Sequence, residues 1–450
     1  MSLLMLLVFV LLQTHQSVSR CQSCEQTSCD CSRQNLRQVP AAPSKPTVTE
    51  LDLSFNRLKK IHKNDFVAYS SLRSLIINNN IIKVIQEQAF VPLTNLVKLD
   101  LSSNRLETLS AEWFKNLLSL QHLDLLGNKY KMLGQGNLFQ PLKRLKTLHL
   151  GGPYLESVRK GDFSGLGALD KVIFEGKNLR AYAEGSLKEI GPIKHAELRL
   201  NGPFWRNREL VEAILSDVVH PNSTLTLTDT VFTTESQMSP FKVVNDGGTR
   251  RFILKNVNLT IGACIAVLNS LSDSNITMLG LEDTKFFLSH FSGFSDSPRM
   301  KHLHEIVWKN IDIPQFYRFP ALFFLHPLLK EVRSVSVINC KLFAHPCEMS
   351  VGLSKVQYMD ISGNILSDMS FSDLMCYGEG GLWSLRTFNI SRNHLKSINS
   401  ELFTKLDKLE NIDMSMNVLQ IMPETCYWPP RLKFLNLSST HLRKVTACLP

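Results

Sequence analysis

A short pattern of two apolar residues and an asparagine, Leu-x-Leu-x-x-Asn, recurs every 24 residues in the first part of the chain. Four consecutive copies begin at Leu51, Leu75, Leu99 and Leu123, with Ile77 in the second apolar place of the second copy. Following the apolar pair onward gives further first positions at Val172, Leu198, Leu225, Phe252, Leu279, Ile306, Val335, Met359, Phe388, Ile412 and Leu435, after Leu148. Such a fixed period predicts a chain of stacked, similar units.

This spacing is the signature of a leucine-rich repeat. We therefore predict an α/β solenoid with a parallel sheet on the concave face and irregular loops and short helices on the convex face. Side chains alternate along a strand, so both apolar residues of each pair face inward. The asparagine should be buried, with its amide bonded to backbone groups of the loop. A phenylalanine after each early strand should fill the convex side, at Phe66, Phe90, Phe114, Phe139 and Phe163.

The asparagine column is interrupted in the middle of the chain. Units five to twelve carry other residues at this place: Pro153, Lys177, Pro203, Thr230, Val257, Thr284, Ile311 and Cys340. Asparagine returns at Asn364, Asn393 and Asn417. We divide the repeats accordingly into residues 47–147, 148–358 and 359–450. The break should remove a hydrogen-bonded row, and its ends are where we expect the core to open into a pocket.

The two ends of the chain carry different signals. An apolar run from Leu3 to Leu12, followed by Ser17-Val18-Ser19, predicts a signal peptide over residues 1–20. A cap with four cysteines follows at residues 21–46. No later stretch is long and apolar enough to span a bilayer, so the mature chain should be secreted as written. No capping module follows the last unit, which predicts that a longer protein continues beyond it.

Cysteines and sequons fit an oxidising, extracellular compartment. The cap cysteines Cys21, Cys24, Cys29 and Cys31 allow three pairings, and Cys347/Cys376 and Cys426/Cys448 have loop-like spacings. Cys264 and Cys340 should be buried free thiols rather than metal ligands. Glycosylation sequons occur at Asn222, Asn258, Asn275, Asn389 and Asn436. The net charge of +10 is only a weak indication of anionic partners.

Residues 313–329, IPQFYRFPALFFLHPLL, are dominated by aromatic and aliphatic side chains and contain three prolines. The prolines prevent a regular helix. Two interpretations are open: bulky filling of a wide repeat, or the lining of an apolar ligand pocket beside the ladder break. Catalytic motifs are missing from the sequence. Gly134-x-Gly136 lacks a third glycine, and His302-x-His304-Glu305 fits a solvated strand edge better than a metal site. We expect no enzyme activity, no cofactor and no metal.

The signal peptide, the cysteine-bearing cap, the repeats and the broken ladder together resemble a Toll-like receptor ectodomain. The likeness is most specific in residues 313–317, residues 341–347 and the segment from Met422 to Pro450. It implies a lipid pocket at the junction of the central and C-terminal repeats, formed by Phe343, Phe319, Tyr317, Phe316 and Pro346. Ile313, Phe323, Phe286 and Leu281 are added for their positions. The resemblance also implies the disulfides Cys347–Cys376 and Cys426–Cys448, and we place Cys24 and Cys29 among the disulfide-bonded residues.

The resemblance implies a pattern-recognition receptor of innate immunity that binds bacterial di- and triacylated lipopeptides and lipoproteins. It would signal by ligand-bridged heterodimerisation with a co-receptor of the Toll-like receptor 1 or 6 type, without nucleic acid. The full-length receptor would be a single-pass protein with this part outside the plasma membrane. Two alternatives stay open: a soluble decoy with the same binding surface, and a secreted leucine-rich-repeat module that binds proteins through its concave face. A nucleic-acid-sensing relative fits less well, because it would keep a regular ladder.

Overall fold

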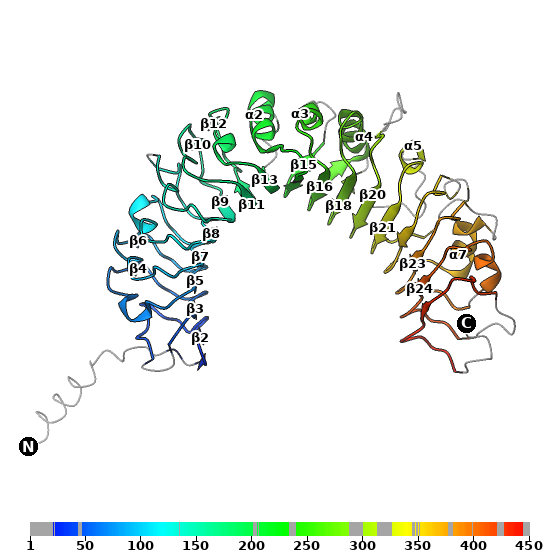
Figure 1. Cartoon of the computed structure of the whole chain (residues 1–450), viewed down its shortest axis with the longest axis horizontal. Helices are drawn as coiled ribbons and strands as arrows, with labels where there is room; N and C mark the ends of the chain where they lie inside the picture. The colour runs from blue at the N-terminus through cyan, green and yellow to red at the C-terminus, as the bar shows by residue number, and fades with distance from the viewer. Residues whose placement is uncertain are drawn as a thin grey trace, which may run out of the picture. The chain divides into compact units, whose positions relative to one another are not determined.

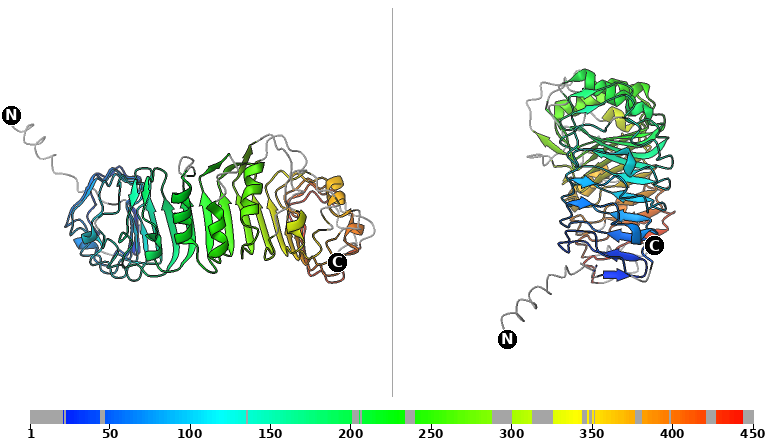
Figure 2. Two further views of the ribbon diagram at one scale, coloured as in Figure 1. Left: turned by 90° about the horizontal axis from the view of Figure 1, so that it is seen from above. Right: turned by 90° about the vertical axis from the view of Figure 1, so that its left-hand side faces the viewer.

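The computed structural model describes residues 21–443, apart from 22, 44–46, 135, 201–204, 206, 234–239, 288–299, 313–325, 344–346, 348–349, 351, 377–380, 398 and 421–426. The predicted signal peptide, residues 1–20, and the cysteines Cys426 and Cys448 lie outside the described residues. The chain forms two compact units, Met1–Ile193 and Lys194–Pro450. In each unit the strands form one face, called here the sheet face, and the return segments form the loop face (Figures 1 and 2).

The first unit is built around a parallel sheet with one strand from each repeat (Figure 1). Its strands are β1 (Ser23–Glu25), β2 (Ser28–Asp30), β3 (Glu50–Asp52), β5 (Ser74–Ile76), β7 (Lys98–Asp100), β8 (His122–Asp124), β9 (Thr147–Gly151) and β11 (Leu169–Glu175). Only β1 pairs antiparallel, with β2. The loop face carries β4 (Lys60–Ile61), β6 (Val84–Ile85), β10 (Ser157–Val158), β12 (Ala181–Tyr182) and the 3-10 turns η1 (Val67–Tyr69), η2 (Ala111–Trp113) and η3 (Leu187–Glu189).

The predicted phenylalanine column forms the core beneath this loop face. Phe66, Phe90, Phe114, Phe139 and Phe163 are all at most 1% exposed. The rings of Phe66 and Phe90 lie 5.8 Å apart, and those of Phe139 and Phe163 lie 6.2 Å apart. These rings therefore pack across neighbouring repeats, which is how a unit too small to fold alone gains a continuous core.

The asparagine ladder of the first unit has the hydrogen bonds that the pattern predicts. The amide nitrogen of Asn104 donates to the carbonyls of Ile77 (2.9 Å) and Leu101 (3.1 Å), and its oxygen accepts from the amide of Ile82 at 3.1 Å. Each ladder residue thus joins two consecutive repeats. After the fourth asparagine, the buried hydroxyl of Tyr130 bonds the next repeat instead, because it accepts from the Gly151 amide at 2.7 Å.

The second unit also has one parallel sheet, but its return segments hold real helices. The strands are β13 (Ile193–Arg199), β14 (Thr224–Thr228), β16 (Arg251–Lys255), β18 (Met278–Glu282), β20 (Glu305–Lys309), β21 (Ser334–Ile338), β22 (Tyr358–Asp360), β23 (Thr387–Asn389), β24 (Asn411–Asp413) and β25 (Phe434–Asn436). The helices are α2 (Arg208–Val218), α3 (Val243–Asp246), α4 (Ile261–Ser270), α5 (His326–Leu329), α7 (Asp368–Leu374) and the 3-10 turn η8 (Ser400–Phe403). They lie on the loop face (Figure 1).

The strand register corrects one predicted repeat. Leu225 pairs with Ala196, whereas the predicted first position was Leu198, which pairs with Leu227. The sequence Ala-Glu-Leu-Arg-Leu contains two overlapping apolar pairs, and the small Ala196 was passed over although it is only 2% exposed. The ladder position of this repeat is therefore Asn201 and not Pro203, so asparagine occurs within the predicted break. Both residues lie outside the described part of the chain.

The central repeats lack the asparagine side chains at the ladder position but keep a row of backbone hydrogen bonds. Their ladder positions are filled by buried Val257 and Thr284, among others. The amide of Lys285 donates to the Val257 carbonyl at 2.9 Å, and that of Asp312 donates to the Thr284 carbonyl at 2.9 Å. These bonds belong to a second parallel sheet on the loop face, made of β15 (Val231–Phe232), β17 (Asn258–Thr260) and β19 (Lys285–Phe287). Main-chain bonds between neighbouring repeats therefore persist where the asparagine side chains are missing, and they also occur in the asparagine repeats, for example from the Lys129 amide to the Leu106 carbonyl at 2.8 Å.

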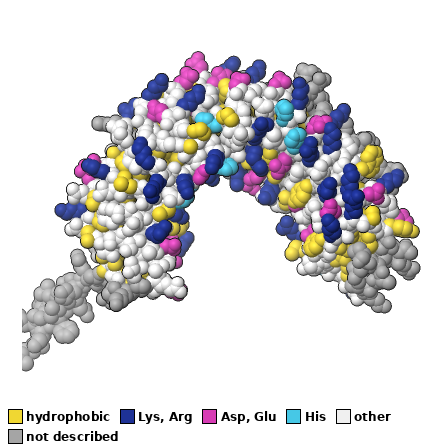
Figure 3. All heavy atoms as spheres, in the orientation of Figure 1, with side chains coloured by type: hydrophobic (Ala, Val, Ile, Leu, Met, Phe, Trp, Pro, Cys, Tyr) yellow, Lys and Arg dark blue, Asp and Glu magenta, His cyan; other side chains and the backbone are white. Residues whose placement is uncertain are grey.

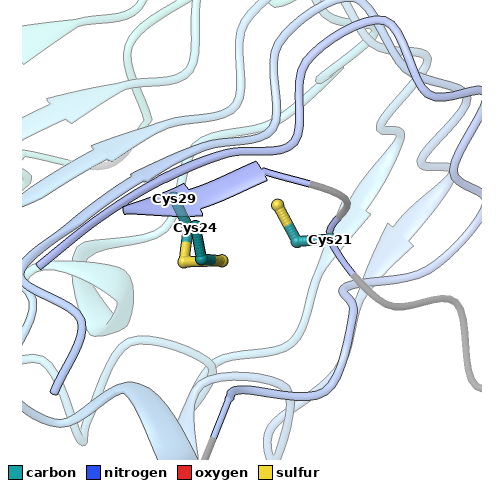
Figure 4. A group of neighbouring side chains, drawn as sticks. All are labelled: Cys21, Cys24 and Cys29. Carbon is teal, nitrogen blue, oxygen red and sulfur yellow. A yellow bond between two sulfur atoms is a disulfide. The ribbon is translucent and has the colours of Figure 1, made fainter. Parts of the chain in front are cut away.

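The cap covers the N-terminal edge of the first unit with two disulfides. They join Cys21 to Cys31 and Cys24 to Cys29. Cys21, Cys24 and Cys29 have sulfur atoms close enough to resemble a metal site (Figure 4), but their thiols are consumed in these bonds. They are therefore structural. Among the helices that the structure describes, none has the length and apolar character needed to cross a bilayer.

Candidate ligand-binding region of the second unit

The edge of the loop-face sheet leads directly into the predicted pocket segment. The amide of Phe286 in β19 donates to the carbonyl of Asp312 at 2.9 Å, so Asp312 extends this small sheet by one bridge. Phe286 is half-buried, and its neighbour Phe287 is 40% exposed. The aromatic residues Phe286 and Phe287 therefore lie next to Asp312, the residue that precedes the segment beginning at residue 313.

The asparagine ladder resumes at the other side of that segment. The side-chain oxygen of Asn364 accepts from the amides of Cys340 (2.9 Å) and Leu342 (3.0 Å). These bonds fix the main chain up to Leu342, whose side chain is buried at 5% exposure. Phe343 follows directly and is 43% exposed. The restart of the ladder therefore presents a large aromatic side chain to solvent.

A polar contact connects these two places. The ammonium group of Lys341 lies 3.0 Å from a carboxylate oxygen of Asp312. Both side chains are largely exposed, so this ion pair contributes less than about 1 kcal/mol to stability. The ion pair instead brings two parts of the chain together, because Lys341 precedes Phe343 by two residues and Asp312 immediately precedes the aromatic segment. One charged pair thus marks the rim of the region.

Most of the residues predicted to line the pocket lie outside the part of the chain that the structure describes. Ile313, Phe316, Tyr317, Phe319, Phe323 and Pro346 are not among the described residues. Leu281 is described and lies in β18, in register with Trp308 of β20 and only 5% exposed. It belongs to the core beneath the sheet face, whereas Phe286 belongs to the loop face. The pocket assignment therefore stays a prediction that rests on Phe343 and Phe286.

The loop after Phe343 is held by a disulfide between Cys347 and Cys376. Cys376 lies two residues after the end of α7, and the hydroxyl of Ser350 donates to the Leu374 carbonyl at 2.6 Å. Helix α7 is fixed in turn by Phe371, whose ring packs 5.9 Å from that of Phe403 in η8. The bridge therefore ties the loop beside the candidate region to a well-packed part of the second unit.

Two of the cysteines that the structure describes, Cys264 and Cys340, are free and buried. Burial raises the pKa of the Cys264 thiol to about 12 and that of Cys340 to about 11. Cys340 also donates to the Ile338 carbonyl at 3.2 Å. A thiol that stays protonated is neither a nucleophile nor a good metal ligand. Cys340 therefore fills a ladder position, as predicted.

A column of Asp and Asn residues at the strand ends was missed by the sequence analysis. These residues immediately precede the ladder position and have positive φ angles: Asp229, Asn256, Asp283, Asn310 and Asn339. Asn310 donates to Asp283 at 2.7 Å, and Asn339 donates to Asn310 at 2.7 Å. Asn and Asp tolerate the left-handed conformation better than most residues. Five such residues at the same place in consecutive units are the signal that could have found this column.

The sequons differ in how far their side chains are free to carry a glycan. Asn222 and Asn275 are exposed, whereas Asn389 is half-buried on β23 and its amide donates to Asp360 at 3.1 Å. We expect a protein secreted from animal cells to carry glycans at Asn222 and Asn275 and little or none at Asn389. Glycopeptide mass spectrometry measures each occupancy. Full occupancy at Asn389 would show that this strand-edge hydrogen bond does not form.

Several hydrophobic side chains are exposed in the C-terminal repeats of the second unit. Tyr358, Met369 and Trp383 are 38%, 74% and 56% exposed, in addition to Phe343. Figure 3 shows hydrophobic surface in this C-terminal part of the chain, among Lys, Arg, Asp and Glu side chains. Hydrophobic side chains that are exposed singly are common on protein surfaces, so the candidate region rests on Phe343 and Phe286.

Comparisons with known proteins agree with this architecture. The family model described as leucine rich repeat matches residues 46–106, 70–129 and 384–442. Toll-like receptor 2 of Homo sapiens is 38% identical over 96% of this chain and 56% of its own length. The chain is a leucine-rich repeat protein homologous to Toll-like receptor 2. Toll-like receptor 2 type-2 of Gallus gallus is 33% identical over 96% of the chain and 55% of its own length.

The chain thus spans about half the length of the curated relatives that it matches. Among solved structures, the crystal structure of the mouse RP105/MD-1 complex is similar, with a TM-score of 0.59 at 16% identity over 92% of this chain and 74% of that one. At this identity the similarity supports the fold alone. The Toll-like receptor resemblance and the α/β repeat fold predicted from the sequence are both confirmed.

Proposed function

We propose that this chain is the ligand-recognising ectodomain of an innate immune receptor, and that it binds bacterial di- and triacylated lipopeptides. The acyl chains would enter an apolar pocket where the central repeats meet the C-terminal repeats, beside Phe343. The bound ligand would bridge this chain to a co-receptor of the Toll-like receptor 1 or 6 type. The complete receptor would hold this part on the extracellular side of the plasma membrane and would act by association, without catalysis.

The observation that carries the proposal is the exposure of Phe343. Its side chain is 43% exposed although the preceding Leu342 is buried and the main chain is fixed by Asn364. An aromatic side chain that is held at the surface by a rigid ladder is available to contact an apolar ligand. Homology to Toll-like receptor 2 supports the receptor class.

The energetics favour acyl chains as the recognised group. Burying each methylene group is worth roughly 0.8 kcal/mol, so two long chains outweigh any single polar contact. Part of this gain is lost to the cost of ordering the ligand. The charged pair of Lys341 and Asp312 would lie at the rim of the proposed pocket and would orient a polar head group while the acyl chains are buried.

Replacing Phe343 with aspartate should reduce the affinity for a diacylated lipopeptide at least tenfold. The substitution places an unpaired carboxylate where acyl chains are expected, and burying that charge is costly. Binding is measured by calorimetry on the secreted chain, with the same peptide lacking its acyl chains as a ligand control. Because Phe343 is already half-exposed, the variant should keep the unfolding temperature of the parent chain.

Phe55→Asp is the matched control variant. Phe55 is 45% exposed in the first unit, with a positive φ of 56° that aspartate accommodates. It should leave lipopeptide binding unchanged. Normal binding by Phe343→Asp, or equal binding of the acylated and unacylated peptides, would overturn the proposal. A second assay measures whether the acylated peptide promotes association with a Toll-like receptor 1 or 6 ectodomain.

A further inference from the structure

A polar groove lies along the flank of the first unit, where the return segments enter the strands. Its volume is about 460 Å³, which is within the range of ligand-binding sites. Its lining comes from five consecutive repeats: Thr49, Ser71, Arg73, Asn95, Val97, Ser119, Gln121 and Arg144. All of these residues belong to the first unit, so the groove is separate from the region around Phe343.

The repeat pattern explains why these side chains line one groove. Each of Leu72, Leu96 and Leu120 is fully buried, and each is flanked by two lining residues, as in Ser71-Leu72-Arg73. When the middle residue points into the core, its two neighbours point outward on the same flank. The same arrangement repeats every 24 residues, so the flanking side chains form two parallel rows that run across the repeats.

The backbone of the groove is already satisfied. The carbonyl of Arg73 accepts from the amides of Val97 (2.8 Å) and Lys98 (2.9 Å), and the carbonyls of Thr49, Val97 and Gln121 each accept two amides in the same way. The backbone therefore forms a fixed floor between the rows. Specificity for a ligand must come from the side chains.

Most of the lining side chains make no polar contacts with the residues that the structure describes. Within the described parts of the chain, the side chains of Ser71, Arg73, Asn95, Gln121 and Arg144 form no hydrogen bond or ion pair. The hydroxyl of Thr49 has a long bond of 3.4 Å to the Thr27 carbonyl. The groove therefore offers two guanidinium groups and several amide and hydroxyl groups to a ligand.

The electrostatics of the groove favour an anion. Its only charged residues are Arg73 and Arg144, and no acidic residue lines it. On the adjacent strand edge, burial and the positive charges of Lys98 and Lys146 lower the pKa of His122, against an opposing effect of Asp170. Lys98 and Lys146 are thus close enough to this edge to add positive charge beside the groove, opposite the negative charge of Asp170. Arginine is well suited to sulfate, phosphate and carboxylate groups because its planar fork matches their oxygens.

The length and polarity of the groove indicate what kind of ligand it would bind. The repeats that contain Arg73 and Arg144 are three strands apart in the sheet. Three strand spacings correspond to about 14 Å. One small anion cannot reach both, whereas a chain of sugars with repeated anionic groups can. Val97 is the only apolar lining residue, so the groove does not suit a lipid. None of the five sequons lies in the first unit, so none attaches a glycan to the repeats that form the groove.

We propose that this groove binds an oligosaccharide carrying sulfate or phosphate groups, with Arg73 and Arg144 each holding one anionic group. Amide and hydroxyl groups of Asn95, Ser119 and Gln121 hydrogen-bond the sugar hydroxyls between them. The site lies in a different unit from Phe343, and it would let one chain bind an anionic glycan and an acylated ligand at the same time.

The test uses the double variant Arg73→Glu/Arg144→Glu of the secreted chain. A sulfated hexasaccharide derived from heparin and a phosphodiester-linked sugar oligomer serve as probes, with a desulfated hexasaccharide and inorganic sulfate for comparison. We expect the parent chain to bind at least one anionic oligomer, and the double variant to bind it at least tenfold more weakly. The tighter-binding oligomer identifies which anion the groove prefers. Inorganic sulfate should bind far more weakly than either oligomer.

Arg37→Glu/Lys83→Glu is the matched control, because both residues are exposed in the first unit outside the groove and the change of charge is the same. Its affinity should stay within twofold of the parent. Equal losses in the two double variants would show a diffuse effect of net charge and overturn the proposal, as would undiminished binding in Arg73→Glu/Arg144→Glu or no binding by the parent. Phe343→Asp should bind the oligomer normally, which separates this site from the lipopeptide site.

Discussion

Replacing Asn104 with leucine is expected to lower the free energy of unfolding of the first unit by about 1–3 kcal/mol. Leucine has the same number of side-chain heavy atoms in the same branched shape, so the change removes hydrogen bonds without opening a cavity. It leaves the amide of Ile82 without its side-chain partner in a buried place, whereas the carbonyl of Ile77 keeps its 3.2 Å bond from Asn80. Each buried group that loses its partner costs about 1–3 kcal/mol.

The effect should be local, because stability in a repeat protein is transmitted through nearest neighbours. Amide hydrogen exchange should accelerate around β5 and β7 and stay unchanged in the second unit, while chemical denaturation gives the total loss. Thr284→Val is the matched control at a ladder position of the central repeats. Its hydroxyl makes a single 3.0 Å bond to Glu282, so we expect a cost of about 1 kcal/mol or less. Equal costs at the two positions would contradict the inference that side-chain hydrogen bonds at the ladder position stabilise the first unit more than the central repeats.

The sequence predicts the repeat fold well because each strand repeats the same physical requirement. Two inward apolar residues and one buried amide are needed in every unit, so the pattern is visible without any structure. It failed at Ala196, because a small buried residue beside two leucines leaves the strand position ambiguous by two residues. A period identifies that a repeat exists, but only hydrogen bonding fixes its register.

The backbone hydrogen bonds between the central repeats are a second feature that the sequence could not predict. Val257 and Thr284 indicate only that asparagine is missing, and the bonds that remain between these repeats pair main-chain groups that every residue has. The exposure of Phe343 was equally hidden, because a phenylalanine beside a buried leucine fits a core as well as a surface. The candidate site was therefore predicted by resemblance more than by pattern, and the groove beside Arg73 was not predicted at all.

Removing the disulfide between Cys347 and Cys376 with serine at both positions should cost the second unit about 3.5 kcal/mol. The two residues are 29 apart in the sequence, and the entropy of closing a loop of that length in the unfolded chain gives this magnitude. The bridge also anchors the loop that follows Phe343 to the end of α7. We therefore expect weaker lipopeptide binding in addition to lower stability.

The matched control is the corresponding double serine variant at Cys24 and Cys29, which are only 5 residues apart. Its shorter loop should cost about 2 kcal/mol, and the loss should fall on the first unit. Hydrogen exchange of the two units, together with lipopeptide calorimetry, distinguishes the variants. Weakened lipopeptide binding in the cap variant, or unchanged binding without Cys347–Cys376, would separate this bridge from the ligand region. The bridge would then stabilise the second unit without positioning the loop beside Phe343.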